Sequence, residues 1–266
     1  MNRHRSWLFV PADRPDFFEK AFSRGADVVV LDLEDGVSAA AKSDARALAV
    51  QVAGQHEVWV RVNRPGTDEG EADMAALAGT VAGFRVPKVD SAADAAWVVA
   101  RAKGAPVACT IESALGLLSS FEIARTQGVT GLVFGAEDYR RDVGCSGDAE
   151  ALRHARSQIV ATARAAALER PVDGAYIGLS DAEGLTASCI EARRLGFGGK
   201  SVVHPAQIEI VNRVFDVTDD EREWATSVTE AFAASRGRPT SVAGDLVDRP
   251  VAERARLLLE KRDVSA

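Results

Sequence analysis

Short apolar runs alternate with amphipathic stretches along most of this chain. Eight runs predict strands, and each is followed by a stretch whose apolar residues recur at the helical period. The predicted strands cover residues 6–10, 26–31, 58–63, 83–88, 107–111, 131–134, 172–177 and 199–203. Runs of this kind, bounded by glycine or polar residues, are typical of buried parallel strands.

Eight strand–helix units without a long linker favour a closed barrel over an open doubly wound sheet. An open sheet that binds a dinucleotide would carry a glycine-rich loop after its first strand, and residues 11–15 read Pro-Ala-Asp-Arg-Pro instead. We therefore predict an α/β fold, a (β/α)8 TIM barrel over residues 1–217. Residues 218–266 are predicted to form a C-terminal helical extension with a flap. It either packs beneath the barrel or contacts a neighbouring subunit.

Composition narrows the class of protein further. Of the 266 residues, 47% are hydrophobic and 27% are charged, as in ordinary globular domains. The net charge of -7 disfavours nucleic acid and anionic membranes as partners. Three cysteines without ligand spacing argue against both a disulfide framework and a zinc site. No apolar stretch approaches a membrane span of about 20 residues, and the basic N-terminus precedes a run too short for a signal peptide, so we expect a cytoplasmic protein.

Charged residues follow most of the predicted strands. In a barrel these strand ends meet at the C-terminal mouth, where active sites of this fold lie. The residues concerned are Arg14, Glu34, Asp35, Arg61, Asn63, Lys88, Glu112, Asp138 and His204. A set with both signs of charge favours an enzyme over a binding module, and the non-catalytic alternative is a barrel retained as a scaffold. For Lys88 a structural ion pair, and for His204 a capping role, remain open alternatives.

Glu112 and Asp138 follow two successive apolar runs. If those runs are neighbouring strands, about 4.8 Å apart, the two carboxylates are placed to share one divalent cation. An oxygen-only donor pair selects Mg²⁺, or Mn²⁺, over zinc. Arg61 needs an anionic partner, either a structural carboxylate or, as we favour, a substrate. A glycosidase acid/base pair is the rival use of the carboxylates, but a cation and a strand-end arginine fit it less well.

Several motifs occur in order along the whole chain. They read LFVPADRP at 8–15, LDLEDGV at 31–37, VRVN at 60–63, PK at 87–88, IESALG at 111–116, FGAED at 134–138 and GK followed by HPAQ at 199–207. This set resembles the HpcH/HpaI aldolase/citrate lyase superfamily, most closely its citrate lyase β-subunit-like branch. The resemblance implies a TIM barrel, usually a homotrimer, that uses Mg²⁺ to cleave or form a carbon–carbon bond in 3-hydroxyacyl-CoA thioesters.

The resemblance also implies roles for residues at the mouth. Glu112 and Asp138 would be the metal ligands. Arg61 would hold the carboxylate and carbonyl of the oxo-acid half of the substrate. Glu34 and Asp35 would hydrogen-bond metal-bound water and orient Arg61.

Further roles concern the rest of the substrate. Backbone amides near Gly135, Ala136 and Glu137 would meet its carboxylate. Arg14 and Lys20 would contact the phosphates of CoA. Asp248 resembles an acidic residue that relatives contribute from a neighbouring subunit, and it is one candidate for the general base, beside a metal-bound water.

One departure concerns the loop after the seventh predicted strand. Gly178 stands where the resemblance would lead us to expect aspartate, so the mouth is less acidic there. The expected reaction is a retro-Claisen cleavage, or its reverse, of a thioester such as citramalyl-, malyl- or citryl-CoA. The alternative within the superfamily is a class II-type aldolase that acts on free 2-keto-hydroxy acids without CoA.

Overall fold

The computed structural model describes residues 4–146 and 148–260. Eight parallel strands close into a barrel in sequence order, and β1 pairs with both β2 and β8. The strands are β1 Ser6–Pro11, β2 Val28–Asp32, β3 Trp59–Arg61, β4 Gly83–Val86, β5 Val107–Ile111, β6 Val129–Phe134, β7 Val172–Asp173 and β8 Gly199–Val202. The predicted (β/α)8 fold is confirmed, although β7 is much shorter than the predicted strand over residues 172–177.

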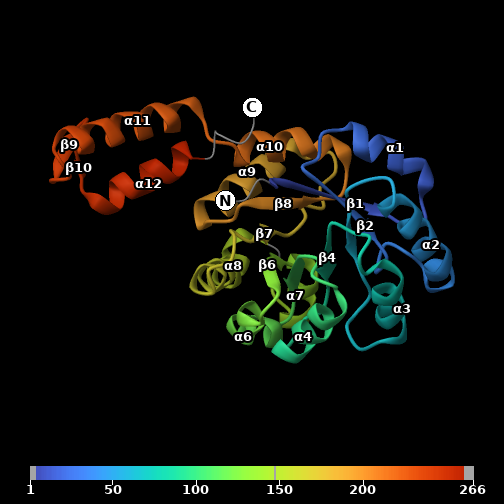
Figure 1. Cartoon of the computed structure of the whole chain (residues 1–266). Coiled ribbons are helices and arrows are strands. Elements are labelled where there is room, and N and C mark those ends of the chain that lie inside the picture. The colour runs from blue at the N-terminus through green and yellow to red at the C-terminus, as the bar shows by residue number, and fades with distance from the viewer. Residues whose placement is uncertain (1–3, 147, 261–266) are drawn as a thin grey trace. The chain divides into compact units, whose positions relative to one another are not determined.

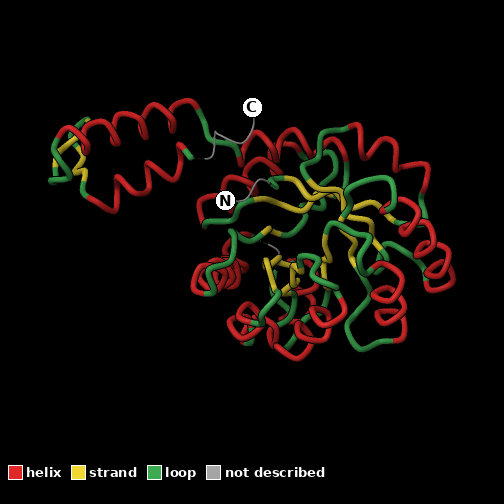
Figure 2. The backbone as a smooth tube through the Cα atoms, viewed as in Figure 1, coloured by secondary structure: helices red, strands yellow, loops and turns green. Residues whose placement is uncertain are grey.

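Helices surround the strands, as Figures 1 and 2 show. They are α1 Pro15–Ser23, α2 Lys42–Ala53, α3 Asp68–Leu77, α4 Ala92–Arg101, α5 Ala114–Leu118, α6 Ser120–Arg125, α7 Ala136–Val143, α8 Ala149–Ala165, α9 Ala182–Leu195 and α10 Ile208–Phe215. Ser119 separates α5 from α6. Ser91 caps α4, since its side chain accepts from the Asp94 N–H.

Alternate residues of the strands divide the core into two layers. Outward-facing side chains such as Leu8, Leu31 and Val60 pack with the helices in the main apolar cluster. Trp7, Val30 and their neighbours form a separate cluster inside the barrel. Because side chains alternate with a period of two, the residues that continue this inner face reach the mouth of the barrel.

A buried ion cluster joins β7 and β8 to α8. The Asp173 carboxylate pairs with Lys200 Nζ at 2.5 Å and with Arg156 Nε at 3.0 Å. All three side chains are nearly inaccessible to solvent. Two cations on one carboxylate, with hydrogen bonds to both oxygens, satisfy the conditions under which a buried ion pair is retained.

Residues 216–260 form a second compact unit with a small core of its own. It contains α11 Asp219–Ala234, the antiparallel hairpin β9 Thr240–Val242 and β10 Asp245–Val247, and α12 Arg249–Leu259. The hairpin was not predicted from the sequence. Its turn places Ala243 and Gly244 at positive φ, the backbone that a two-residue hairpin turn requires.

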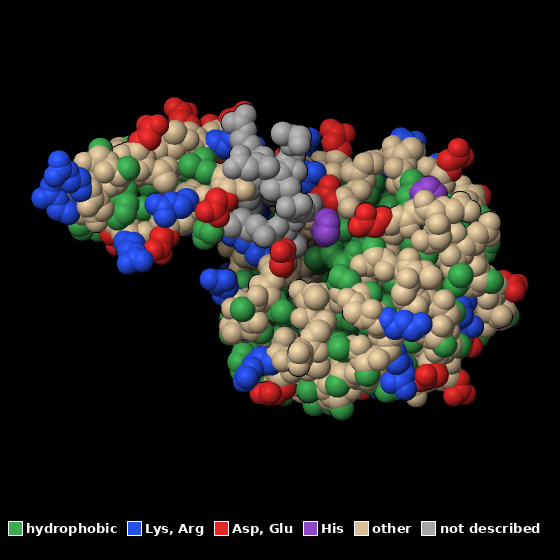
Figure 3. All heavy atoms as spheres, in the orientation of Figure 1, with side chains coloured by type: hydrophobic (Ala, Val, Ile, Leu, Met, Phe, Trp, Pro, Cys, Tyr) green, Lys and Arg blue, Asp and Glu red, His purple; other side chains and the backbone are tan. Residues whose placement is uncertain are grey.

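The surface carries side chains of both charges, as the composition indicates. On the face drawn in Figure 3, acidic and basic side chains are interspersed. Among the described residues, no helix is long and apolar enough to cross a membrane.

Candidate active site

The mouth of the barrel brings together charged side chains from β2, β3 and β5. Asp32 and Arg61 are the last residues of β2 and β3 and are register partners, and Glu112 directly follows β5. All three lie at the ends of strands whose inner faces fill the barrel. Arg61 and Glu112 belong to the predicted set of strand-end residues, whereas Asp32 does not.

Arg61 is held in one orientation by two carboxylates. Asp32 accepts from its Nε at 2.6 Å and from its Nη2 at 2.7 Å, and Glu34 lies 3.0 Å from Nη1. Burial by itself lowers the pKa of Arg61, but the hydrogen bonds and charge of Asp32 outweigh burial and the pKa is raised. Burial likewise raises the pKa of Asp32, and Arg61 reverses this so that the pKa is lowered. Both groups are therefore charged, and the guanidinium retains further N–H donors for a ligand.

Glu34 and Asp35 differ in their surroundings. Glu34 is buried and pairs with Lys88 Nζ as well as with Arg61. Burial raises the pKa of Glu34, and the two cations only partly offset this. Asp35 is exposed, and its Oδ1 lies 3.5 Å from Lys88 Nζ. The structure thus places Glu34 against Arg61 and shows the structural ion pair that was an alternative for Lys88.

Glu112 is 7% exposed and sits in a tight backbone setting. Lys88 has a φ of 53°, uncommon for a residue other than glycine, and its N–H donates to Glu112 Oε1 at 2.6 Å. On the other side, a Cβ added to Gly135 would lie 2.5 Å from the Glu112 Cβ and closer still to Oε2. The chain therefore accepts an unusual conformation at position 88 and needs glycine at 135 to hold this carboxylate in place.

The electrostatic setting of Glu112 suits a cation. Burial, followed by the charges of Glu34 and Asp138, raises the pKa of Glu112 to about 7. Asp138 lies in the first turn of α7, where its Oδ1 is 2.6 Å from Nη2 of the exposed Arg141. An extra cation beside Glu112 and Asp138 would relieve the repulsion between these carboxylates.

The donor set fits magnesium. Among the described residues, no group of three or more His, Cys, Asp or Glu side chains is arranged to hold a metal ion. Mg²⁺ does not need one, because it is commonly bound by one or two carboxylates and keeps water or substrate oxygens as its other ligands. Glu112 and Asp138 would supply the two carboxylates, and Mn²⁺ would accept the same donors.

The start of α7 supplies backbone N–H groups near these carboxylates. The Gly135 N–H already donates to the Ile111 carbonyl at 3.0 Å, so it is not available to a substrate. No described side chain caps the first turn of α7, which leaves the amides of Ala136 and Glu137 as helix N-terminal donors. The Glu137 side chain itself turns to Arg140, at 2.9 Å.

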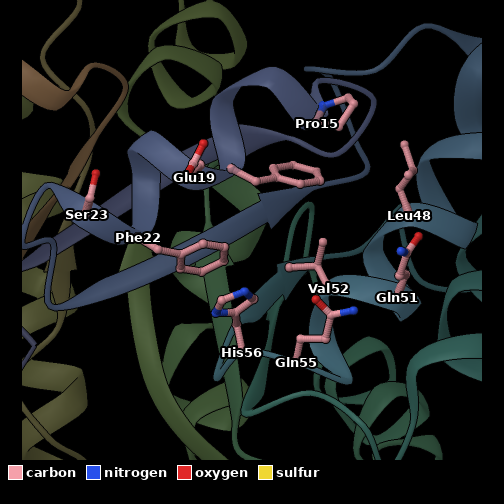
Figure 4. Close-up of a pocket in the computed structure, with 10 residues that line it drawn as sticks. Pro15, Glu19, Phe22, Ser23, Leu48, Gln51, Val52, Gln55 and His56 are labelled. Carbon is pink, nitrogen blue, oxygen red and sulfur yellow. The ribbon is translucent and has the colours of Figure 1, made fainter.

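Arg14 and Lys20 lie at the start and near the end of α1. Arg14 pairs with Asp16 at 2.7 Å and stacks over Phe17, while Lys20 is exposed. A groove of about 550 Å³ runs between α1 and α2, but neither of these cations is among its lining residues. Figure 4 shows the Phe22 and His56 rings facing each other in this groove; their centroids are 4.0 Å apart.

Two predicted residues have local capping roles. Asp248 caps α12 by accepting from the Val251 N–H at 3.2 Å, and its predicted action in a neighbouring subunit stays a prediction. His204 Nδ1 accepts from the Ala206 N–H at 3.2 Å, which is the capping alternative for this histidine.

The sequence reasoning missed three residues inside the barrel. These are Asp32, Arg85 and Ser201, none of which is among the predicted strand-end residues. Asp32 could have been found from the alternation of side chains along its strand. It lies two residues after Val30 and four after Val28, so its side chain faces the barrel interior as theirs do. Arg85, on β4, donates from Nη1 to Ser201 Oγ of β8 at 2.9 Å.

Gly178, which stands where aspartate was expected, lies against the ring of Tyr176. A Cβ added there would lie 2.7 Å from Cε1 of Tyr176. The Tyr176 hydroxyl donates to Asp181 Oδ2 at 2.5 Å. Glycine at 178 thus makes room for the Tyr176 ring.

The fold and the mouth define a barrel enzyme with a buried glutamate and an arginine fixed by carboxylates at its strand ends. The sequence profile of the HpcH/HpaI aldolase/citrate lyase family matches residues 5–205. The chain belongs to this family.

Individual relatives match over nearly the whole chain. A citrate lyase subunit beta-like protein from Mycobacterium tuberculosis strain H37Rv is 35% identical over 264 residues, covering 96% of this chain and 94% of the relative. A (3S)-malyl-CoA thioesterase from Cereibacter sphaeroides strain ATCC 17029 is 35% identical over 269 residues, covering 98% and 93%. The crystal structure of CitE from Mycobacterium tuberculosis with magnesium, acetoacetate and coenzyme A has a TM-score of 0.86 at 33% identity, covering 97% of each chain.

Proposed function

We propose that this protein is a magnesium-dependent carbon–carbon lyase that cleaves or forms a 3-hydroxyacyl-CoA thioester of the malyl-, citramalyl- or citryl-CoA type. The observation that carries the proposal is the presence at one mouth of a buried Glu112, held by the Lys88 N–H, and an Arg61 fixed by Asp32 and Glu34. The similarity to proteins whose crystals hold magnesium with coenzyme A or oxaloacetate supports it.

In this mechanism Arg61 binds the oxo-acid half of the substrate. Its remaining N–H groups donate to that half's carboxylate and to the oxygen on the carbon where the bond breaks. The hydroxyl proton leaves to a base, the carbon–carbon bond breaks, and the CoA half departs as a thioester enolate that is then protonated. Magnesium, held by Glu112 and Asp138, would supply Lewis-acid polarisation of the same oxygen. The amides of Ala136 and Glu137 would bind the carboxylate at the helix N-terminus.

The proposal extends to the CoA half and to assembly. Arg14 and Lys20 are proposed to contact its phosphates, and Asp248 is proposed to reach a neighbouring subunit of a homotrimer in the cytoplasm. The support is the resemblance of these motifs, together with the position of Arg14 just beyond the end of β1.

The decisive experiment is a product assay. Malyl-, citramalyl- and citryl-CoA are each incubated with the protein and Mg²⁺, and acetyl-CoA and the matching oxo acid are measured. We expect cleavage of at least one thioester, its loss on chelation, and a fall of at least about a hundredfold in Glu112→Gln, because a metal ligand is lost. The matched control is Glu122→Gln, an exposed glutamate of α6, which should be unaffected. Undiminished cleavage by Glu112→Gln would remove the metal assignment.

Two other reactions are read from the same assay. Release of free CoA together with the intact hydroxy acid would indicate thioester hydrolysis, the activity that the Cereibacter relative's name states. Cleavage of free 2-keto-hydroxy acids, with none of the CoA thioesters, would indicate the class II-type aldolase. Absence of all three reactions would favour the scaffold alternative.

A further inference from the structure

Arg85 crosses the interior of the barrel just below the mouth. It lies on β4 as the register partner of Arg61 and is 4% exposed. Its Nη1 reaches Ser201 Oγ on β8 at 2.9 Å, and β4 and β8 lie on opposite sides of the eight-stranded barrel. The guanidinium therefore forms part of the floor beneath Arg61.

No described carboxylate forms an ion pair with Arg85. Asp32 and Glu34 are engaged by Arg61, and no described carboxylate lies within ion-pair distance of Arg85. Its Nε is buried without a described hydrogen-bond partner, and its Cζ lies 4.5 Å from the centroid of the Phe9 ring. Burial, followed by Arg61, lowers the pKa of Arg85 to about 9, and the charges of Glu112, Asp32 and Glu34 only partly offset this; Arg85 is still protonated at pH 7. A buried, protonated arginine without an ion-pair partner is unfavourable until an anion binds to it.

A second unpartnered group lies on the next strand. Thr110 is two residues beyond Ala108, the register partner of Arg85, and therefore faces the same way as Ala108 and Glu112. Its Oγ1 is buried without a described hydrogen-bond partner. Ser201, which accepts from Arg85, keeps its own O–H as a donor. Three donors are thus available on the floor, although buried polar groups are normally satisfied.

We propose that Arg85, with Thr110 and Ser201, forms a subsite for a second carboxylate on the oxo-acid half of the substrate. This inference rests on the proposed function, in which Arg61 binds the first carboxylate. It makes Arg85 a specificity-determining residue. Acids with two carboxylates place an anion on Arg85, whereas acids with one leave that cation unmatched, so the site selects the former.

The test compares two stable hydroxy acids that differ by one carboxylate. Binding of malate and of lactate is measured by calorimetry in the presence of Mg²⁺, for the wild-type protein and for Arg85→Met. We expect the wild type to prefer malate. A charge-assisted hydrogen bond is worth enough that the preference should fall on the order of tenfold in Arg85→Met, with lactate binding almost unchanged.

Further variants separate specificity from structure. Arg85→Lys keeps the charge and should retain much of the preference, and Thr110→Val should lower it severalfold while preserving shape. Arg101→Met removes an arginine that pairs with Glu71 on the outer helices and should leave the preference unchanged. Unfolding in urea is followed in parallel, and Arg85→Met should be at least as stable as the wild type because an unmatched buried charge is removed.

The outcomes are distinct from those of the product assay. An equal loss of malate and lactate binding in Arg85→Met, or an unchanged ratio, would overturn the subsite. A wild-type protein without preference for malate would overturn it as well. The acids are tested without CoA or turnover, so a protein that hydrolyses thioesters instead of cleaving carbon–carbon bonds would still give a clear answer about Arg85.

Discussion

At the scale of single residues, Asp32 determines how Arg61 is presented. It forms a two-point ion pair with the guanidinium and also accepts the N–H groups of Glu34 and Gly36 at 2.9 Å. One carboxylate thereby fixes both the arginine and the loop that carries Glu34. Fork-to-fork pairing of this kind sets the orientation of a guanidinium as well as its charge.

Asp32→Asn should therefore impair substrate handling more than folding. The amide cannot accept at two points, so Arg61 loses a charge-assisted contact. We expect kcat/KM to fall about a hundredfold, corresponding to the upper range for a hydrogen bond to a charged group. Steady-state kinetics measure the effect, and Glu71→Gln, which breaks the exposed pair with Arg101, is the control. A change of less than twofold in Asp32→Asn would show that Arg61 keeps its orientation without Asp32.

Gly135 gives a second prediction at this scale. In Gly135→Ala the new methyl group collides with Glu112, so Mg²⁺ affinity should fall at least about tenfold because the carboxylate must move. Gly131→Ala on β6, the strand that leads to Gly135, is the matched control, since its added Cβ would lie 3.8 Å from that of Ala108, an ordinary contact. Calorimetric titration with Mg²⁺ compares the two. Equal affinities would show that Glu112 is free to shift.

At the scale of elements, the alternation of strands explains what the sequence reveals and what it hides. Long apolar runs such as those before Glu112 and Asp138 predict both the strand and the polar residue at its end. Only two residues of β7 are paired as a strand, and β4 has four, too few for the sequence to show which side chains face inward. Arg85 was missed for this reason.

Partners across the barrel were also hidden from the sequence. The residues that Arg61 and Arg85 contact lie 29 and 116 positions away. Periodicity fixes the face on which a side chain lies, but it does not identify the residue opposite. From the sequence we favoured a substrate as the anionic partner of Arg61, and Asp32 was therefore overlooked. The same limit applies to the β9–β10 hairpin, whose three-residue strands are shorter than a pattern can reveal.

The ion cluster that links β7 and β8 to α8 gives a prediction about stability. Asp173→Asn leaves Lys200 and Arg156 buried without their shared carboxylate, which typically costs about 3–5 kcal/mol of unfolding free energy. Urea unfolding at pH 7 measures this. Glu253→Gln, in the exposed pair with Arg249, should change stability by less than about 0.5 kcal/mol.

The cluster also has a defined pH dependence. Burial raises the pKa of Asp173, but Lys200 and Arg156 outweigh burial and the pKa is lowered below its unfolded value. Its contribution is therefore complete above the unfolded pKa of about 4 and is lost as the pH falls through the folded pKa. The stability difference between wild type and Asp173→Asn should be largest near neutral pH and should narrow on acidification. A difference that grows towards low pH would contradict the assignment.

At the scale of the whole molecule, the two compact units raise the question of where Asp248 acts. If it serves the site of a neighbouring subunit, Asp248→Ala and Glu112→Gln should each be inactive alone and should regain activity when co-expressed. In a randomly mixed cyclic oligomer, roughly a quarter of the sites combine an intact Glu112 with an intact Asp248. Activity of the purified mixed oligomer, with its mass from light scattering, measures this. Full activity of Asp248→Ala alone would exclude the role.

Closure of the barrel has a consequence for synthesis on the ribosome. The first strand, β1, completes its hydrogen bonding only with β8, through pairs such as Ser6 with Lys200. Until residue 202 has left the exit tunnel, one side of β1 is an unpaired strand edge, the kind of surface that associates with other chains. The nascent chain must therefore keep this edge covered while most of the protein is made, and a factor that shields emerging chains should raise the yield of folded protein.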